Sequence, residues 1–321
     1  MAKTSTKNQW KAWLYLLPTL VLLGVFTVWP IINTVRMSLL EGYNGLAMIR
    51  GETFEFGFAN FVDVATYAGF INCLGNTLLL CVITVPISTM LALLIAVALN
   101  SIKFIRKGMQ TIFFLPYVTN SIAIGMVFMA MFSMVGGSAT NAPDSVGIIN
   151  NIIKAFGGKP INWVNGKISG YDPSERWANM AVLIIYIVWN ALPFKILVLL
   201  GGLQGVNKQY YDAAKIDGTS RFRTFWRITV PLLSPMIAYV VITGFIGGFK
   251  EYSSVVGIFG NNMGPAHTNF RTNMNTMVGY IYDSLKDNNQ GQASAAALIL
   301  FAIIFVVTMI NLYVSKKKVH Y

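Results

Sequence analysis

The chain has 321 residues, of which 55% are hydrophobic and only 11% are charged, and its mean hydropathy is +0.58. A typical soluble domain carries about 25% charged residues, so this composition excludes an ordinary soluble protein and indicates a membrane protein. The formal net charge of +12 would suggest nucleic-acid binding in a soluble protein. Here the basic residues flank apolar segments, which is typical of cytoplasmic loops, and no nucleic-acid partner is expected.

Six segments are long and apolar enough to cross a bilayer, which takes about 20 residues. They predict an all-α membrane protein with a transmembrane domain at 13–314, between a cytoplasmic N-terminal segment, 1–12, and a basic cytoplasmic tail, 315–321. The first span follows several lysines, but it is too long for a signal peptide and no cleavage motif follows it. The predicted spans are 13–39, 74–99, 111–134, 178–203, 236–259 and 293–314.

The charges of the loops predict the orientation of these spans. Lys and Arg outnumber Asp and Glu before the first span, after the second, after the fourth and after the sixth, whereas acidic residues dominate after the first. This distribution places both termini and the 204–235 loop in the cytoplasm. In the long outer loop, 135–177, the segment Ser145–Phe156 has apolar residues at helical spacing and predicts a short amphipathic helix. It could lie at the outer membrane interface, but packing on the neighbouring spans is the favoured interpretation.

The 204–235 loop predicts two short helices joined by a glycine. Asn207 can cap the first helix, Gly218 can supply the positive φ of a helix end, and Thr219 or Ser220 can cap the second helix. In the second helix one face is aromatic, and two prolines then break the chain before the next span. These aromatic residues and prolines are Phe222, Phe225, Trp226, Pro231 and Pro235.

This loop resembles the coupling loop of the integral-membrane subunits of ABC importers. The family pattern is Glu-Ala-Ala, three residues, Gly, nine residues, then Ile-x-Leu-Pro. The chain keeps this spacing, with Asp in place of Glu and Val230 in place of Leu. The resemblance implies that the loop docks on an ATPase, where two alanines let a helix seat closely in a cleft. The residues implied are Asp212, Ala213, Ala214, Gly218, Ile228 and Pro231.

Further motifs are similar to those of the carbohydrate, or maltose-importer-like, branch of these permeases. They are Trp189–Phe194, Gly202–Gln204 and Gly244–Lys250, while the glycine-rich run of the family is matched only in part, at Asn261–Pro265. The resemblance implies the type I ABC importer permease fold and sugar or oligosaccharide import by alternating access. The implied partners are a second homologous permease, an ABC ATPase dimer that binds ATP and Mg, an extracytoplasmic solute-binding protein and membrane lipid.

Motifs for nucleotide binding or catalysis are missing from the sequence. There is no GxxxxGK[ST] phosphate loop and no HExxH motif. The two histidines, His267 and His320, are expected on opposite sides of the membrane, and Cys73 and Cys81 do not form a CxxC pair. We therefore expect no catalytic residue, no metal site and no cofactor on this chain, with ATP hydrolysis on a separate one.

Polar and aromatic residues of the fourth span are candidates for the solute pathway. Aromatic rings stack on the C–H faces of sugars and amides bond their hydroxyl groups, which suits Tyr186, Trp189 and Asn190. The alternative is that these three residues only pack helices together. Lys195 lies roughly 8 Å from the cytoplasmic boundary at about 1.5 Å per residue, and we expect its amine to extend to that boundary.

Two adjacent charges, Lys250 and Glu251, lie deeper in the predicted fifth span. Intramembrane charges mark functional sites, and adjacent residues on a helix do not face each other. At least one of the two is therefore predicted to line the solute path, with a structural pair between helices as the alternative.

Other functions remain open at this point. Permeases for glycerol phosphate, polyols and acidic saccharides have similar sequences. An ion-coupled secondary transporter would favour inverted repeats and a carboxylate relay in its spans, but Glu251 is the one carboxylate there and no repeat is visible. A membrane enzyme would need a catalytic set that the sequence does not show. The sequence alone does not name the solute.

Overall fold

The computed structural model describes residues 9–102, 108, 111–112, 115, 117–135, 145–166, 174–260, 263 and 274–318. Several predicted features lie outside the described residues: most of the basic segment after the second span, part of the third span, both histidines and most of the 261–265 run. The chain forms two units, Met1–Tyr67 with Ile281–Ile299, and Ala68–Tyr280 with Leu300–Tyr321.

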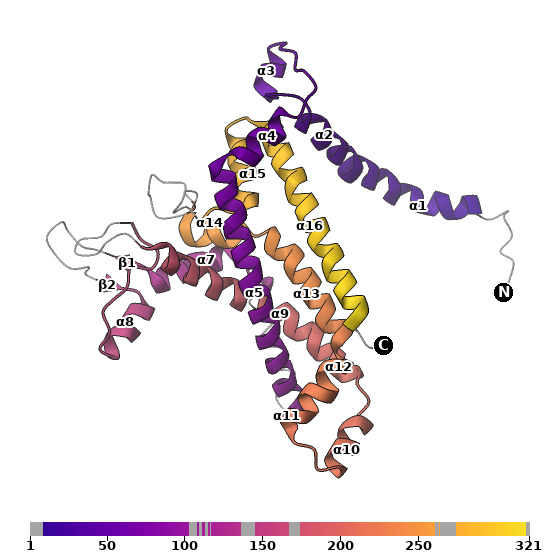
Figure 1. Cartoon of the computed structure of the whole chain (residues 1–321), viewed down its shortest axis with the longest axis vertical. Helices are drawn as coiled ribbons and strands as arrows, with labels where there is room; N and C mark the ends of the chain where they lie inside the picture. Colours follow the sequence, from indigo (N-terminus) through magenta and orange to yellow (C-terminus); the bar gives the residue numbers. More distant parts are fainter. Residues whose placement is uncertain are drawn as a thin grey trace. The chain divides into compact units, whose positions relative to one another are not determined.

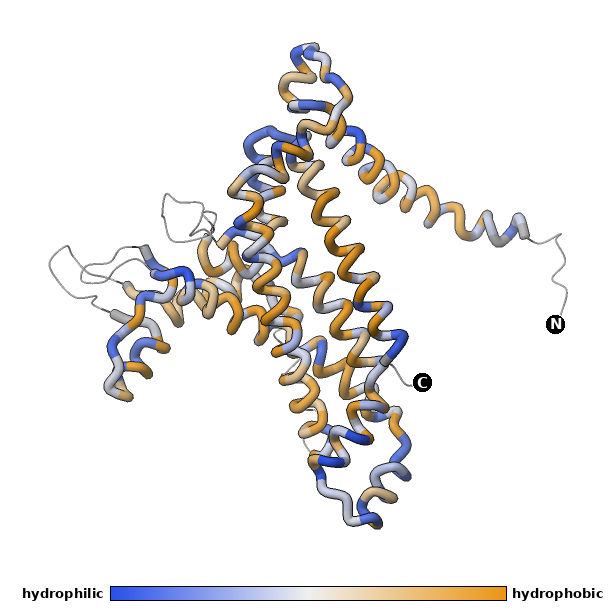
Figure 2. The backbone as a smooth tube through the Cα atoms, viewed as in Figure 1, coloured by the Kyte–Doolittle hydropathy of each residue, from blue (hydrophilic) through white to orange (hydrophobic). Residues whose placement is uncertain are grey.

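The first unit begins with a long apolar helix. It consists of α1 (Gln9–Leu23), the π-helical turn η2 (Gly24–Val28) and α2 (Trp29–Ser38), and Trp13–Ser38 within it is long and apolar enough to cross a membrane. Ser38 is its one buried residue among those whose exposure is described. Its exposed side chains are mostly apolar (Figure 2), so lipid or another subunit must cover them. The predicted first span is confirmed as a helix.

Two side-chain amides, one buried and one partly buried, connect the rest of the first unit. It contains α3 (Gly45–Ile49), α4 (Ala59–Thr66), the end of α15 (Met277–Lys286) and the start of α16 (Gln290–Lys318). Asn60 Nδ2 donates to the carbonyl oxygens of Ser38 at 3.1 Å and Leu40 at 2.7 Å. Gln290 Oε1 accepts from the Gly45 amide at 2.8 Å. These bonds satisfy backbone groups that would otherwise be unpaired.

The second unit is built on two long helices, α5 (Ala68–Ser101) and α9 (Arg176–Gly205), which pack along each other (Figure 1). A third helix, α13 (Ser234–Phe249), packs on both. The end of α16 also belongs to this unit. The segments predicted as the second, fourth and sixth spans thus lie within helices α5, α9 and α16, each long and apolar enough to cross a membrane.

A second packing contact joins α7 (Ser121–Phe132) to α14 (Ser253–Phe259). It depends on two glycines that meet backbone to backbone. A Cβ placed on Gly125 would lie 2.7 Å from the Cα of Gly257, and one on Gly257 would lie 2.9 Å from the Cα of Gly125. Only glycine permits this approach, as in other membrane helix pairs.

The predicted outer loop contains a small hairpin and one short helix. The strands β1 (Met134–Val135) and β2 (Ser145–Val146) pair antiparallel, and α8 (Ile148–Ala155) follows. The predicted helix is therefore confirmed from residue 148, whereas 145–146 form a strand. Asn150 is fully buried and binds Ile161 through both amide atoms, at 2.9 and 3.0 Å. With Ile149 packed on the core, this favours a helix held against the protein.

The number of spans is not settled by helix length. Within the described residues four helices are long and apolar enough to cross a membrane, or five if a bent pair, Arg221–Leu232 and Ser234–Phe249, forms one span. With 12 residues, α7 is apolar but shorter. The six-span prediction therefore stays a proposal.

The prediction of a continuous helix at 236–259 is wrong. Helix α13 ends at Phe249, and α14 begins only at Ser253. Gly247 and Gly248 weaken the helix before the break. Glu251 then binds the start of α14, where the first amides of a helix have no partner within it: its Oε1 accepts from the Ser254 amide at 3.1 Å.

Candidate coupling loop and membrane cavity

The segment 207–233 forms the two predicted short helices. The first is α10 (Gln209–Ile216); Asn207 Oδ1 accepts from the Gln209 amide at 3.0 Å, as expected of a capping residue. It ends before Gly218, whose φ is +64°. The second comprises α11 (Arg221–Thr224), the π-helical turn η3 (Phe225–Thr229) and α12 (Val230–Leu232). Of the two predicted caps, Ser220 is the one used: its Oγ accepts from the Arg223 amide at 3.3 Å.

The two alanines of α10 face different ways. Ala214 is buried, with only 5% of its surface exposed. Ala213 is exposed, and so is Ile216, at 86%, one turn further on. The expectation that both alanines would seat in a partner's cleft is therefore corrected: the outward face carries Ala213 and Ile216. Asp212 is exposed too and pairs with Lys215 at 3.3 Å, a surface pair of little energetic weight.

The segment is tied back to the membrane helices at its far end. Ile228 and Pro231 are partly buried, and Thr229 is buried. The hydroxyl groups of Tyr211 and Thr229 lie 3.4 Å apart and join α10 to η3. The chain then bends by 71° between Leu232 and Ser234, close to the predicted break at Pro231 and Pro235. The short capped helix α10 is therefore linked to α13 through η3 and this bend.

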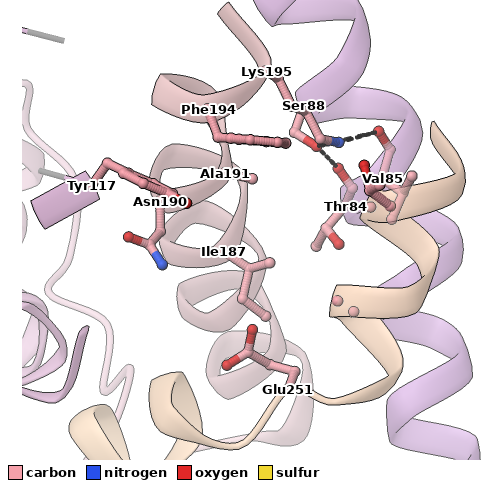
Figure 3. A pocket seen from close by; sticks show the side chains of 14 residues that line it. Thr84, Val85, Ser88, Tyr117, Ile187, Asn190, Ala191, Phe194, Lys195 and Glu251 are labelled. Atoms are coloured by element: carbon pink, nitrogen blue, oxygen red, sulfur yellow. Dashed lines mark hydrogen bonds between the residues drawn. The ribbon is translucent and has the colours of Figure 1, made fainter. Parts of the chain in front are cut away.

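A cavity of about 280 Å³ lies inside the second unit, among α5, α9, α13 and the break after α13 (Figure 3). Phe194 and Tyr117 contribute stacked rings, with centroids 5.9 Å apart and planes 20° apart. Asn190 contributes an amide and Glu251 a carboxylate. The lining residues are Thr84, Val85, Ser88, Tyr117, Ile187, Asn190, Ala191, Phe194, Lys195, Thr243, Gly244, Gly247, Gly248 and Glu251.

Lys195 lies at one side of the cavity, and its amine is held within the protein. It is only 4% exposed. Its Nζ donates to Ser88 Oγ at 2.7 Å, Thr89 Oγ1 at 2.9 Å and, at 3.3 Å, the carbonyl oxygen of Val85. The expectation that its amine would reach water is wrong, because α5 supplies three acceptors inside the bundle.

The other predicted pathway residues are placed differently from one another. Asn190 and Glu251 line the cavity, whereas Tyr186, Trp189 and Lys250 are not among its lining residues. Tyr186 is buried, packs on Phe128 and donates to the Ser121 carbonyl at 2.6 Å. Trp189 also packs on Phe128, with ring centroids 5.5 Å apart. Lys250 is exposed, at the residue after α13.

Most of the lining was not predicted from the sequence, including its main aromatic and cationic contributors, Tyr117, Phe194 and Lys195. Phe194 falls in the same Trp189–Phe194 motif, one helical turn after Asn190, and this spacing could have indicated it. For Lys195 the sequence signal was weaker. It consisted of two adjacent hydroxyl residues in another apolar helix, Ser88 and Thr89, which could have indicated a partner for a buried amine.

Comparison with known proteins places this architecture in a family. Residues 85–320 match the model of the binding-protein-dependent transport system inner membrane component. The chain belongs to this family. The permease is 31% identical over 303 residues to the lactose transport system permease protein LacF of Rhizobium radiobacter, covering 93% of this chain and 91% of that one. It is 30% identical over 309 residues to the arabinooligosaccharides transport system permease protein AraP of Bacillus subtilis, covering 94% and 88%.

A solved structure supports the fold of the permease. A chain of a bacterial alginate ABC transporter, in complex with an alginate pentasaccharide-bound periplasmic protein, matches with a TM-score of 0.74. The match covers 97% of this chain and 96% of that one, at 21% sequence identity. At this identity the likeness establishes that the chain has an ABC importer permease fold. It does not identify the solute. Membership of a binding-protein-dependent family also decides against ion-coupled secondary transport.

Proposed function

We propose that this permease forms half of the translocation pathway of an ATP-driven importer of sugars or oligosaccharides. The observation that carries the proposal is the cavity at the broken α13–α14 segment, where two aromatic rings, an amide and a carboxylate converge. Interrupted helices at membrane depth are where transporters bind solutes. The names of LacF and AraP, two relatives over nearly the whole chain, support sugars as the solute class.

The segment 207–233 is proposed as the element that couples the permease to a separate ATPase. Its exposed face of Ala213 and Ile216 suits insertion into a cleft, and its bond between Tyr211 and Thr229 connects α10 to the rest of the segment. Closure of an ATPase dimer on ATP and Mg would move α10, and the bent segment would transmit that motion to α13. Rigid-body levers of this kind are common in switching proteins.

The remaining partners and the topology follow from the same proposal. The permease pairs with a second homologous permease and receives its solute from an extracytoplasmic binding protein. Its transmembrane domain occupies 13–314 with six spans, α7 belonging to the third and α13–α14 to the fifth. The segments 1–12 and 315–321 are cytoplasmic. No metal or cofactor is assigned to this chain.

Reconstitution of the complete complex tests the proposed function. We expect ATP hydrolysis only when the ATPase subunits are present, and stimulation when the binding protein is supplied with a neutral oligosaccharide such as lactose, maltose or arabinotriose. The purified permease alone is expected to hydrolyse no ATP. If glycerol phosphate stimulated ATP hydrolysis and no oligosaccharide did, the proposed solute class would be wrong, and glycerol phosphate would take its place. Hydrolysis by the permease alone would overturn the assignment of its role.

Thiol labelling in intact cells tests the topology. A cysteine at exposed Ala155, in the proposed outer loop, should react with a membrane-impermeant maleimide, whereas one at exposed Lys316 should react only after the cells are opened. The native Cys73 and Cys81 are buried, so the parent protein gives the background. Labelling of Lys316→Cys in sealed cells would contradict the proposed placement of the C-terminus.

A further inference from the structure

We propose that Glu251 makes the cavity selective for uncharged, hydroxyl-rich solutes and against acidic ones, and that Lys195 does not offset this selectivity. The inference rests on the proposed function and narrows its solute class. The question is which of the two charged side chains that line the cavity, Glu251 or Lys195, is free to bind a solute. Figure 3 shows them entering the cavity from different sides.

The carboxylate of Glu251 is held in place by one of its two oxygens. Oε1 accepts from the Tyr252 amide at 3.2 Å, the Ser254 amide at 3.1 Å and Ser254 Oγ at 2.8 Å. The backbone is fixed as well, because Thr276 Oγ1 donates to the Glu251 carbonyl at 2.7 Å. The side chain is thus oriented before any solute arrives, and no induced movement is needed to present it.

The other oxygen of Glu251 remains available. Within the described part of the chain, Oε2 makes no hydrogen bond, and the side chain is only partly buried where it lines the cavity. An ionised carboxylate accepts hydrogen bonds and donates none. Sugar hydroxyl groups can therefore donate to Oε2 in charge-assisted bonds, which are stronger than those between neutral groups.

Lys195 cannot serve an acidic solute in the same way. An ammonium group has three hydrogens, and the Nζ of Lys195 has three protein acceptors, on Ser88, Thr89 and Val85. All three acceptors are uncharged oxygens, and the side chain is almost fully buried. To bind a carboxylate or phosphate group, Lys195 would have to give up these bonds.

The described residues that line the rest of the cavity include no replacement cation. Apart from Lys195 and Glu251, the lining residues are neutral, and no arginine or histidine is among them. No ion pair joins Lys195 to Glu251 among the described residues. Lys250, the residue before Glu251, is exposed and is not among the described lining residues. Within the described lining a solute carboxylate would therefore meet a like charge without an unengaged cation, and like charges in a shared site repel. This favours neutral saccharides and polyols over the acidic saccharides and glycerol phosphate that the sequence left open.

Charged thiol reagents measure this selectivity without knowledge of the solute. Ala191 lines the cavity and is partly exposed, so Ala191→Cys provides a reporter in the assembled complex in nanodiscs. Two methanethiosulfonate reagents are compared at this cysteine, the cationic trimethylammonioethyl and the anionic sulfonatoethyl derivative. The labelling rate of each reagent is divided by the rate at which the same reagent reacts with 2-mercaptoethanol in solution. The complex without the added cysteine gives the background of Cys73 and Cys81.

We expect the cationic reagent to react faster at Ala191→Cys after this normalisation. Adding Glu251→Gln should reduce the cation-to-anion ratio by about fivefold, as expected when one charge is removed from the cavity lining, whereas Lys195→Met should change it less because its charge is already bonded to three oxygens. A faster anionic reagent in the Ala191→Cys complex would overturn the proposal, and this result does not depend on the folding of either added variant. A larger shift with Lys195→Met than with Glu251→Gln would overturn it too.

The experiments distinguish a failure of the proposed importer function from a failure of the proposed role of Glu251. If the complex shows no solute-stimulated ATP hydrolysis with any neutral oligosaccharide, the proposed function fails whatever the labelling ratio. If hydrolysis is stimulated by a neutral oligosaccharide but the cavity prefers the anionic reagent, the importer function stands and the role of Glu251 is wrong.

Discussion

Replacing Ala213 by tryptophan should abolish solute uptake by the assembled importer. Ala213 is exposed on α10, beside Ile216, and its neighbour Ala214 is buried within the segment. A bulky ring at Ala213 would leave the segment's own packing intact but would not fit a cleft shaped for a methyl group. Overpacking of this kind costs about 1–3 kcal/mol, enough to weaken association roughly tenfold to a hundredfold. The measurement is co-purification of the ATPase with the permease, together with uptake in proteoliposomes.

Two further variants make this result specific. Ala213→Ser retains the small volume and should preserve co-purification and uptake. Ala214→Trp should instead damage the segment itself and lower the yield of folded permease, because that side chain has no room. Full ATPase association in Ala213→Trp would show that α10 does not dock in the proposed way.

Adding one methyl group at Gly125 should destabilise the permease strongly. The new Cβ would lie 2.7 Å from Gly257 Cα and 2.9 Å from Gly257 C, both backbone atoms that cannot turn aside. Separation of α7 from α14 would follow, with a loss of about 1–3 kcal/mol typical of overpacking. We expect Gly125→Ala to lower the melting temperature in detergent by several degrees and to reduce the yield of monodisperse protein.

The matched control for this variant is Gly75→Ala. Gly75 also lies in an apolar membrane helix, but nothing lies within 4 Å of the Cβ it would gain. Alanine is the better helix former, so the control should be neutral or slightly stabilising. Equal melting temperatures for the two variants would contradict the close contact between α7 and α14.

Features that depend on neighbouring residues were predictable from the sequence. Helix caps are local, and Asn207, Gly218 and Ser220 act within a few residues of their partners. Long apolar helices are local too, which is why α5, α9 and α16 match predicted spans. The outward face of α10 was not predictable, because spacing alone does not say which of two adjacent alanines packs inward.

Features that depend on distant residues were missed. Lys195 binds Ser88, which lies 107 residues earlier in the chain, and no pattern within its own span reveals that partner. The fifth span was predicted as continuous because its apolar residues outweigh Lys250 and Glu251 in any window of that length. The structure instead breaks the helix there, so that Glu251 can bind the first amides of α14. Whether a polar residue interrupts a span or lies within it depends on such partners.

The burial of Lys195 also has a consequence for how the chain enters the membrane. Its acceptors lie on α5, and Gly244 of α13 leaves room for it: a Cβ there would come within 3.2 Å of Lys195 Nζ. A lone lysine costs about 2.5–3.5 kcal/mol at the centre of a span, and less nearer the boundary, where Lys195 is expected. Because α5 precedes α9 in the chain, the hydroxyl groups of Ser88 and Thr89 are synthesised before Lys195. We therefore expect α9 to enter the lipid most favourably once α5 is there to bind Lys195.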